Sequence, residues 1–262
     1  MIPKIIHYFW FGENELPEQV KKCIASWEKY CPDYEIVQWN EQNYDINKNE
    51  YMRQAYENKK WGFVPDYARL DVIYEYGGIY FDTDVELIKS FDNLLDQKGF
   101  CGIERDTKYI NLGSGFGACK NNETIKAIRD NYDELEFIKD GVLNLTPSPR
   151  INTNALKKIG YQFSEGIFQC GDLTIYPWEY FCPQSYETGE ISLSEETYSI
   201  HHFSASWHDS KQALAHRLRK KFIKFLPKTF SGYMAQAIAT LRYEGITETI
   251  HKIVKKIKIN NK

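Results

Sequence analysis

Two aspartates, Asp82 and Asp84, come directly after the short apolar segment Ile79-Tyr80-Phe81 in the first third of the chain. Carboxylate oxygens at the end of a strand are suitable ligands for Mg²⁺ or Mn²⁺. The chain has 14 aspartates among 262 residues, so about one Asp-x-Asp pair is expected by chance, and the motif alone is weak. Its interpretation as a metal site depends on the residues around it.

A charge pair precedes the two aspartates. Asp66 and Arg69 are three residues apart on a predicted helix over 66–76, so their side chains share one face of that helix. Pro65 marks the start of this helix and Gly77-Gly78 follows its end, immediately before the apolar segment. An ordinary surface ion pair is the simpler alternative for these two residues.

The order Asp-x-x-Arg, helix, Gly-Gly, apolar strand and Asp-x-Asp resembles the glycosyltransferases of family 32, as do the aromatic opening at 2–12 and the spacing from Arg69 to Tyr80. This family contains bacterial capsular and lipopolysaccharide sugar transferases, which are related to the glucosyltransferase domains of large clostridial toxins. The resemblance covers about 1–210. It implies a GT-A fold, which is a Rossmann-like mixed α/β sheet flanked by helices, and a nucleotide-sugar donor that is most often linked to UDP.

The resemblance also implies roles for the charged residues. Asp84 would bind the metal directly, and Asp82 would contact both the metal and the donor ribose. Asp66 and Arg69 would contact the donor sugar, and the guanidinium of Arg69 also suits phosphate because it forks onto oxyanions. A Mn²⁺ or Mg²⁺ ion on the phosphates would stabilise the departing diphosphate.

A third metal ligand is expected in the segment His201-His202-Phe203-Ser204, which follows a predicted strand. Similar enzymes have a metal-binding histidine here and, five residues later, a tryptophan that contacts the donor phosphates. His202 has that spacing to Trp207, so His202 is the predicted ligand and His201 the alternative. Successive strand residues face opposite sides, so one of the two histidines is expected to pack instead.

Four more residues match the family pattern. Trp10, at the end of the first predicted strand, would stack on the uracil ring, although a tryptophan that packs in the core is the alternative. Tyr80 would contact the nucleotide. Asn111 and Ser114 would line the donor sugar and the acceptor cleft, and the segment 147–154 is a weaker candidate for a further sugar contact.

The elements that must position these residues follow from hydrophobic patterning. A strand at 4–11, a helix at 20–30 and a strand at 34–39 are typical of the start of a nucleotide-binding half-domain. Further helices are predicted at 49–59 and 122–132, and further strands at 99–103, 114–119, 173–176 and 197–203. We therefore expect a catalytic domain over 1–210, followed by a helical extension.

The extension, 211–262, is basic and amphipathic. It carries 13 Lys and Arg against 2 Glu, so its net charge is +11, whereas 1–210 is at −14. One interpretation is a helix packed on its own domain; the other is peripheral contact with an anionic membrane, where a lipid-linked acceptor sugar would be found. Nucleic acid is not expected as a partner, because the rest of the chain is acidic.

The cellular location is also indicated. No apolar window is long enough to span a bilayer, and the chain does not open like a secretory leader. The six cysteines contain no C-x-x-C pair and are expected to be reduced. A cytoplasmic protein is predicted, and peripheral binding would place it at the inner face of the plasma membrane.

The resemblance implies a metal-dependent, retaining glycosyltransferase that acts in capsule, exopolysaccharide or lipopolysaccharide synthesis, and this is the predicted function. A haloacid-dehalogenase-like phosphohydrolase is one alternative, because Phe81-Asp82-Thr83-Asp84-Val85 also fits an apolar strand with an aspartate pair. That fold normally begins with its aspartate pair, whereas here about 80 residues come first. A non-catalytic sugar-binding protein is the other alternative.

Overall fold

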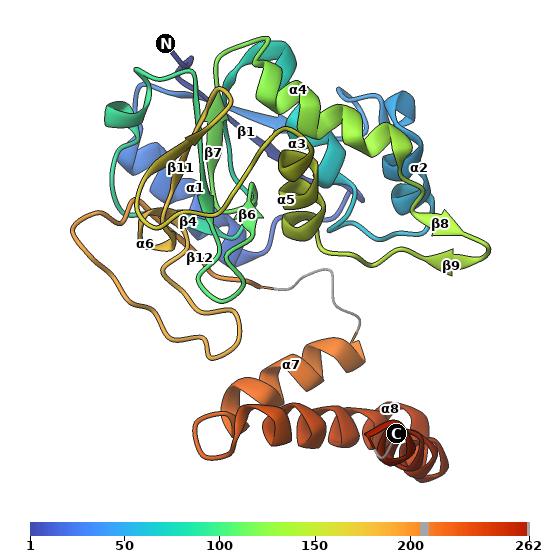
Figure 1. The fold of residues 1–262 in the computed structure, drawn as a ribbon. Helices are drawn as coiled ribbons and strands as arrows, with labels where there is room; N and C mark the ends of the chain where they lie inside the picture. Colours follow the sequence, from blue (N-terminus) through green and yellow to red (C-terminus); the bar gives the residue numbers. More distant parts are fainter. Residues whose placement is uncertain (205–209, 261–262) are drawn as a thin grey trace. The chain divides into compact units, whose positions relative to one another are not determined.

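The computed structural model describes residues 1–204 and 210–260, with side chains up to residue 252. It divides into two compact units (Figure 1). The first consists of Met1–Gln184 and Ile191–Ser204, and the second of Ser185–Glu190 and Ala205–Lys262. The candidate site lies in the first unit, which we describe first.

An eight-stranded sheet forms the centre of the first unit, within residues 1–204. Its strands run in the order β10-β11-β5-β7-β3-β1-β2, and β6 pairs with β5. The bounds are β1 Ile5–Phe9, β2 Glu35–Trp39, β3 Gly78–Tyr80, β5 Gly99–Ile103, β6 Ile110–Asn111, β7 Phe116–Ala118, β10 Phe168–Cys170 and β11 Leu173–Tyr176.

The sheet is mixed. Strand β1 is parallel to both β2 and β3, and β11 is parallel to β5, whereas β7 is antiparallel to its neighbours β3 and β5. Helices cover the sheet with the bounds α1 Glu18–Tyr30, α2 Glu50–Glu57, α3 Pro65–Tyr76, α4 Glu123–Asp130, α5 Ser148–Lys158 and α6 Trp178–Phe181. The expected α/β fold with a mixed sheet flanked by helices is confirmed.

Hydrophobic cores lie on both faces of the sheet. Tyr8 and Phe9, adjacent on β1, belong to different buried clusters because successive strand residues point to opposite faces. The cluster of Phe9 contains apolar residues of α2 to α5, and that of Tyr8 contains Trp27 of α1 and Phe181 of α6. Helices on both faces therefore fix the strand ends that carry the site.

Two glycines bring α3 directly onto the sheet. Gly77 and Gly78 have φ of +71° and +103°, a region that side chains strongly disfavour. A Cβ on Gly78 would lie 2.7 Å from the carbonyl oxygen of Ile5 on β1. The absence of side chains here lets β3 begin beside β1, and Asp82 follows two residues after β3.

The structure differs from the predicted elements in several places. The strand expected at 197–203 is shorter, β12 Ser199–His201, and it pairs with β4 Val85–Leu87 in a separate two-stranded sheet. Helix α5 has no counterpart among the predicted elements. The small hairpin of β8 Ile138–Lys139 and β9 Val142–Leu143 also lacked a clear pattern. Short 3₁₀ helices complete the unit at Ile46–Lys48, Asp92–Leu94 and Asn131–Glu134.

The second unit is a helical hairpin of α7 Ser210–Phe222 and α8 Lys228–Asn260, in which Gly245 interrupts the helical backbone. The predicted extension began at 211, and the unit also includes the short segment Ser185–Glu190. Glu187 of that segment forms ion pairs with Arg219 and Lys228. Among the described residues, no helix has the length and apolarity needed to cross a membrane.

Candidate functional site

Asp82 is held from three sides. Its backbone N–H donates to the Gly113 carbonyl at 3.0 Å, and its Oδ1 accepts a hydrogen bond from the Tyr80 hydroxyl at 2.9 Å. Arg69 Nη1 lies 3.4 Å from the same oxygen. The side chain is 27% exposed, Oδ1 is fixed by these contacts, and Oδ2 lies on the side of His201, 4.0 Å from its Nε2.

Behind Asp82, Asp66 and Arg69 form a buried ion pair rather than a surface one. Arg69 Nη2 is 2.6 Å from Asp66 Oδ1, and Arg69 Nε donates to the Pro65 carbonyl at 3.0 Å. Burial raises the pKa of Asp66 to about 7, against the opposing effect of Arg69. Burial also opposes the charge on Arg69, but the surrounding Asp82, Tyr80 and Asp66 raise the pKa of the guanidinium above its ordinary value.

Asp84 is held by Ser204, the last residue of the first unit, and by His201. Its Oδ2 accepts from the Ser204 N–H at 2.7 Å, and its Oδ1 lies 3.1 Å from His201 Nε2. Burial acts to raise the pKa of Asp84, but His201 and the Ser204 N–H outweigh it and keep this pKa well below the ordinary value. Asp84 is therefore ionised and ready to bind a cation.

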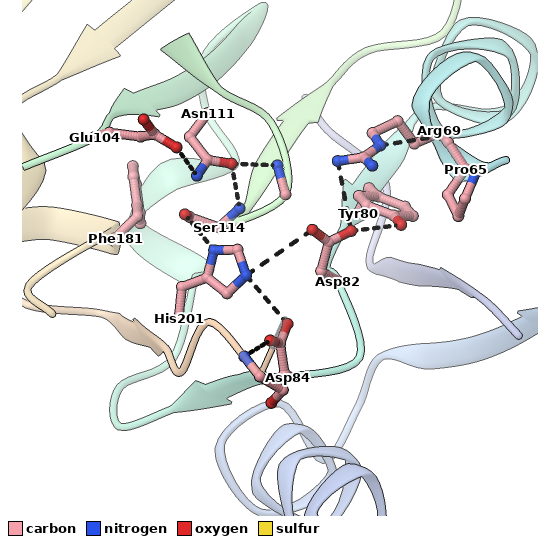
Figure 2. A network of polar contacts seen from close by, with 12 residues as sticks. Pro65, Arg69, Tyr80, Asp82, Asp84, Glu104, Asn111, Ser114, Phe181 and His201 are labelled. Atoms are coloured by element: carbon pink, nitrogen blue, oxygen red, sulfur yellow. Dashed lines mark hydrogen bonds and ion pairs between the residues drawn. The ribbon is translucent and has the colours of Figure 1, made fainter. Parts of the chain in front are cut away.

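His201 completes a cluster with the two aspartates (Figure 2). Its Nε2 is 3.1 Å from Asp84 Oδ1 and 4.0 Å from Asp82 Oδ2. One oxygen or nitrogen atom from each of the three residues lies within 4.8 Å of the others. The β4–β12 pairing, with His201 opposite Val85, brings this histidine from the far end of the unit to the aspartates.

The histidine differs from the prediction, which named His202 as the ligand and His201 as the alternative. His202 Nε2 is 2.8 Å from Glu86 Oε2, away from the two aspartates. Because adjacent strand residues face opposite sides, only one of the two histidines can point at the aspartates. The spacing to Trp207 selected His202, and Trp207 itself lies outside the described residues.

The three side chains suit a divalent cation. Two carboxylates and one imidazole are ligands that Mn²⁺ accepts readily, and the carboxylates alone suit Mg²⁺. Asp82, Asp84 and His201 have exposed side-chain fractions of 27, 16 and 9%, so the cluster is recessed but reachable. Such an arrangement can bind a cation that also contacts an anionic ligand such as a diphosphate.

The other predicted site residues lie at different depths. Trp10 follows β1 at its carboxyl end, is partly buried, and donates from Nε1 to the Asn14 carbonyl at 2.6 Å. Tyr80 is 1% exposed, and Asn111 and Ser114 are 4 and 1% exposed. The last three contact other site residues rather than open space.

Three further residues contact the site; Glu104 and Gly113 are not among the predicted site residues, and Ser148 lies in the segment 147–154, which was predicted as a weaker candidate. Glu104, which follows β5, accepts a hydrogen bond from Asn111 Nδ2 at 3.1 Å. Ser148, at the start of α5, hydrogen-bonds to the Asp66 carboxylate. A Cβ on Gly113 would lie 2.0 Å from Asp82 Oδ2, so no side chain fits there.

Comparison with known families gives one match inside this region. Residues 17–101 match the family described as "Glycosyltransferase sugar-binding region containing DXD motif". The match includes Asp66, Arg69, Tyr80 and the two aspartates, and it ends before Asn111 and His201. It supports the resemblance to DXD-type glycosyltransferases over that third of the chain.

Curated relatives match over similar lengths. Inositol phosphoceramide mannosyltransferase 3 of Schizosaccharomyces pombe is 34% identical over 98 residues, which are 36% of this chain and 27% of the relative. Mannosyl phosphorylinositol ceramide synthase SUR1 of Saccharomyces cerevisiae is 33% identical over 146 residues, which are 53% of this chain and 37% of the relative. The chain thus spans about a quarter to two fifths of the length of these relatives.

Solved structures with a similar chain include two glycosyltransferases. PaToxG glycosyltransferase has a TM-score of 0.43 and 22% identity, over 60% of this chain and 68% of the other. Galactosyltransferase LgtC has a TM-score of 0.44 and 13% identity, over 87% of this chain and 99% of the other.

Proposed function

We propose that this protein is a metal-dependent glycosyltransferase that transfers a sugar from a nucleotide-sugar donor. The observation that carries the proposal is the cluster of Asp82, Asp84 and His201, with the buried pair of Asp66 and Arg69 directly behind it. The family match over residues 17–101 supports the same activity.

The site residues would have different roles in binding the metal and the donor. Asp84 and His201 would hold a Mn²⁺ or Mg²⁺ ion with Asp82, and this ion would stabilise the negative charge on the departing diphosphate. Arg69 fixes the orientation of Asp82 through Oδ1, while Oδ2 lies 4.0 Å from His201 Nε2, on the side of the cluster. Trp10, beyond the end of β1, would stack on the nucleotide base. We propose that the anomeric configuration is retained, as the resemblance implies.

The resemblance and the relatives suggest which classes of donor and acceptor to test. The resemblance favours a UDP-sugar, while the names of the curated relatives describe transfer of mannose to inositol phosphoceramide, a lipid. We therefore propose a saccharide or lipid-linked acceptor, with capsule, exopolysaccharide or lipopolysaccharide synthesis as one setting. GDP-mannose belongs beside the UDP-sugars among the donors to be tested.

A lipid-linked acceptor would be reached at a membrane surface. The second unit exposes large apolar side chains beside basic ones: Phe225 is 85% exposed and Phe230 51%, with exposed Lys221 and Lys224 nearby in the chain. Aromatic and basic side chains together favour the surface of anionic lipid. We propose that this unit holds the protein at the cytoplasmic face of the membrane.

The family match favours the transferase over the two alternatives. A phosphohydrolase of the haloacid-dehalogenase type normally begins with its aspartate pair, whereas Asp82 and Asp84 come after about 80 residues of this chain. A sugar-binding protein without activity would bind free glycans but no nucleotide, so nucleotide binding distinguishes it from a transferase.

Donor hydrolysis and metal binding provide the test. Screening UDP-sugars and GDP-mannose with Mn²⁺ for release of the nucleoside diphosphate should identify one donor that is turned over. Asp84→Asn should reduce that turnover by at least about 100-fold, because the ion loses a charged ligand. Asp33→Asn, on an exposed aspartate paired with Lys4, serves as the control and should keep wild-type turnover. Equal turnover by Asp84→Asn, or binding of free glycans but no nucleotide, would contradict the proposal.

A further inference from the structure

The loop from Asn111 to Ser114 lies under the candidate metal cluster rather than in a cleft. Asn111 and Ser114 are 4 and 1% exposed, so neither side chain is open to a bound sugar. Their polar atoms are instead bonded within the protein, in a chain of contacts that ends on His201 (Figure 2).

Ser114 contacts the ring nitrogen of His201 that faces away from the aspartates. Ser114 Oγ is 2.9 Å from His201 Nδ1, while Nε2 points at Asp84. A neutral imidazole carries one proton, so Nε2 can bind a metal only if Nδ1 holds that proton. When an ion replaces the Nε2 proton that now faces Asp84, Nδ1 keeps its proton, Ser114 Oγ accepts the hydrogen bond from it, and the Nε2 lone pair is directed at the ion.

Asn111 fixes the loop that carries this serine. Its Oδ1 accepts from the backbone N–H groups of Gly113 at 2.8 Å and Ser114 at 3.2 Å. Its Nδ2 donates to Glu104 Oε1 at 3.1 Å. Because a carboxylate can only accept, Glu104 determines which end of the Asn111 amide faces the loop.

The same loop also sets the position of Asp82. The Gly113 carbonyl accepts the hydrogen bond from the Asp82 N–H, and Gly113 leaves space that Asp82 Oδ2 needs. One short loop therefore holds two members of the cluster, His201 through a side chain and Asp82 through the backbone.

We infer that Ser114 is a positioning residue that orients His201 with Nε2 toward the metal, and that Glu104 and Asn111 hold Ser114 in place. The inference rests on the proposed function, in which Asp82, Asp84 and His201 hold a divalent ion. It replaces the expectation that Asn111 and Ser114 line the sugar pocket. Outer hydrogen-bond partners of a metal-binding histidine typically change metal affinity by about 10- to 100-fold.

Titration of the full chain with Mn²⁺, with free Mn²⁺ measured by electron paramagnetic resonance, tests the inference. Ser114→Ala should weaken Mn²⁺ binding by about 10- to 100-fold, and Ser114→Thr, which keeps the hydroxyl, should restore most of it. Ser231→Ala removes a buried hydroxyl that bonds only carbonyls of the second unit, and it should bind Mn²⁺ as the wild type does. Wild-type Mn²⁺ affinity in a folded Ser114→Ala variant would overturn the inference.

A second measurement uses the wild-type chain and does not depend on how the variants fold. With Mg²⁺ and UDP bound, the ¹⁵N shifts of His201 should show a protonated Nδ1 and an unprotonated Nε2; the opposite tautomer would overturn the inference. Mn²⁺ binding without turnover of any nucleotide sugar would contradict the proposed function alone. The Mn²⁺ affinities of the Ser114 variants would still test whether Ser114 orients His201. A wild-type chain that binds no Mn²⁺ would overturn both.

Discussion

At the scale of single residues, the buried guanidinium of Arg69 balances the negative charges of two carboxylates, Asp66 and Asp82. Arg69 is 3% exposed and contacts Asp66, Asp82 and the Pro65 carbonyl. Removing one member of a buried ion pair typically costs 3–5 kcal/mol, because the remaining charge is left without a partner. That cost reflects the carboxylate left unpaired rather than a net gain from the pair, and Arg69 also stabilises the negative charge of Asp82.

Arg69→Met should therefore lower the free energy of unfolding by about 3–5 kcal/mol. Adding Asp66→Asn should recover part of that loss, since the uncompensated carboxylate is then gone. Urea unfolding followed by tryptophan fluorescence measures the first unit, which holds five of the six tryptophans. Strictly additive effects of the two changes would show that Asp66 and Arg69 do not act as a pair.

The sequence predicts which residue types gather at the site better than it predicts their orientation. Asp66, Arg69, Asp82 and Asp84 come from one continuous stretch, so helix periodicity and strand order bring them together. The histidine comes from a strand more than 110 residues away, and its side is set by the register of β12 on β4. A one-residue change of that register exchanges His201 and His202, which no local pattern determines.

At the scale of elements, the neutral imidazole of His7 links β1 by hydrogen bonds to β2 and to Gly77, which follows α3. Its Nδ1 accepts from Trp39 Nε1 on β2 at 3.1 Å, and its Nε2 donates to the Gly77 carbonyl at 2.9 Å. Burial lowers the pKa of His7 to about 4, against a smaller opposite effect of the Gly77 carbonyl. The folded chain therefore binds fewer protons than the unfolded chain between pH 4 and 6.5.

Stability should fall as the pH drops through that window. Relative to pH 7, His7 should cost about 2 kcal/mol at pH 5, because the unfolded chain gains a proton that the folded chain resists. Urea unfolding at the two pH values measures the difference. His7→Gln should show a smaller pH-dependent loss, whereas His251→Gln, an exposed histidine of α8, should keep the wild-type difference. An unchanged difference in His7→Gln would assign the acid sensitivity to other groups.

Two glycines should respond differently to replacement by alanine. Gly113→Ala places a Cβ where Asp82 Oδ2 lies, so we expect at least about 10-fold weaker Mn²⁺ binding. Gly232, within α8, meets only Arg219 at 3.9 Å, so Gly232→Ala should leave Mn²⁺ binding unchanged and add up to about 1 kcal/mol to helix stability. Calorimetric Mn²⁺ titration and thermal unfolding of both variants measure these effects. Unchanged Mn²⁺ binding in Gly113→Ala would show that the loop does not constrain Asp82.

Elements with strong local signals could be predicted, and those fixed by tertiary contacts could not. Helix α3 begins at a proline and ends at two glycines, and strand β5 was predicted with its exact bounds, 99–103. Helix α5 has no counterpart among the predicted elements; it contains Pro149 in its first turn, where a proline is tolerated. Buried side chains of α5 such as Ile151 and Leu156 supply the packing that local propensity does not indicate.

At the scale of the whole molecule, the charge is divided between an acidic body and a basic end. The net charge is −14 over 1–210 and +11 over 211–262. In the helical hairpin, small residues such as Ala235 and Ala239 are buried, whereas Phe230, Tyr233 and Leu241 on α8 are 39 to 51% exposed. A hairpin that exposes its large apolar side chains while it buries its small ones is suited to contact with another apolar surface.

The proposed membrane contact predicts a graded loss of vesicle binding. Each basic residue near an anionic surface contributes about 1 kcal/mol, so replacing Lys221 and Lys224 by Gln should weaken binding of the full chain by about 30-fold. Sedimentation with phosphatidylserine-containing vesicles measures this, and raised salt should weaken wild-type binding in the same direction. The matched control replaces Lys21 and Lys22, two exposed lysines of α1.

Substitution of the exposed aromatic side chains distinguishes insertion into the lipid from attraction to the lipid by charge alone. Phe225→Ser and Phe230→Ser remove apolar area that is 85 and 51% exposed, so they should weaken binding even at high salt, where the lysines contribute least. Thermal unfolding should be nearly unchanged, because these rings are largely outside the hairpin core. If the serine variants bound as tightly as the wild type at every salt concentration, the second unit would attract lipid by charge alone. If the lysine variants also bound normally, the exposed face would have a different partner from a membrane.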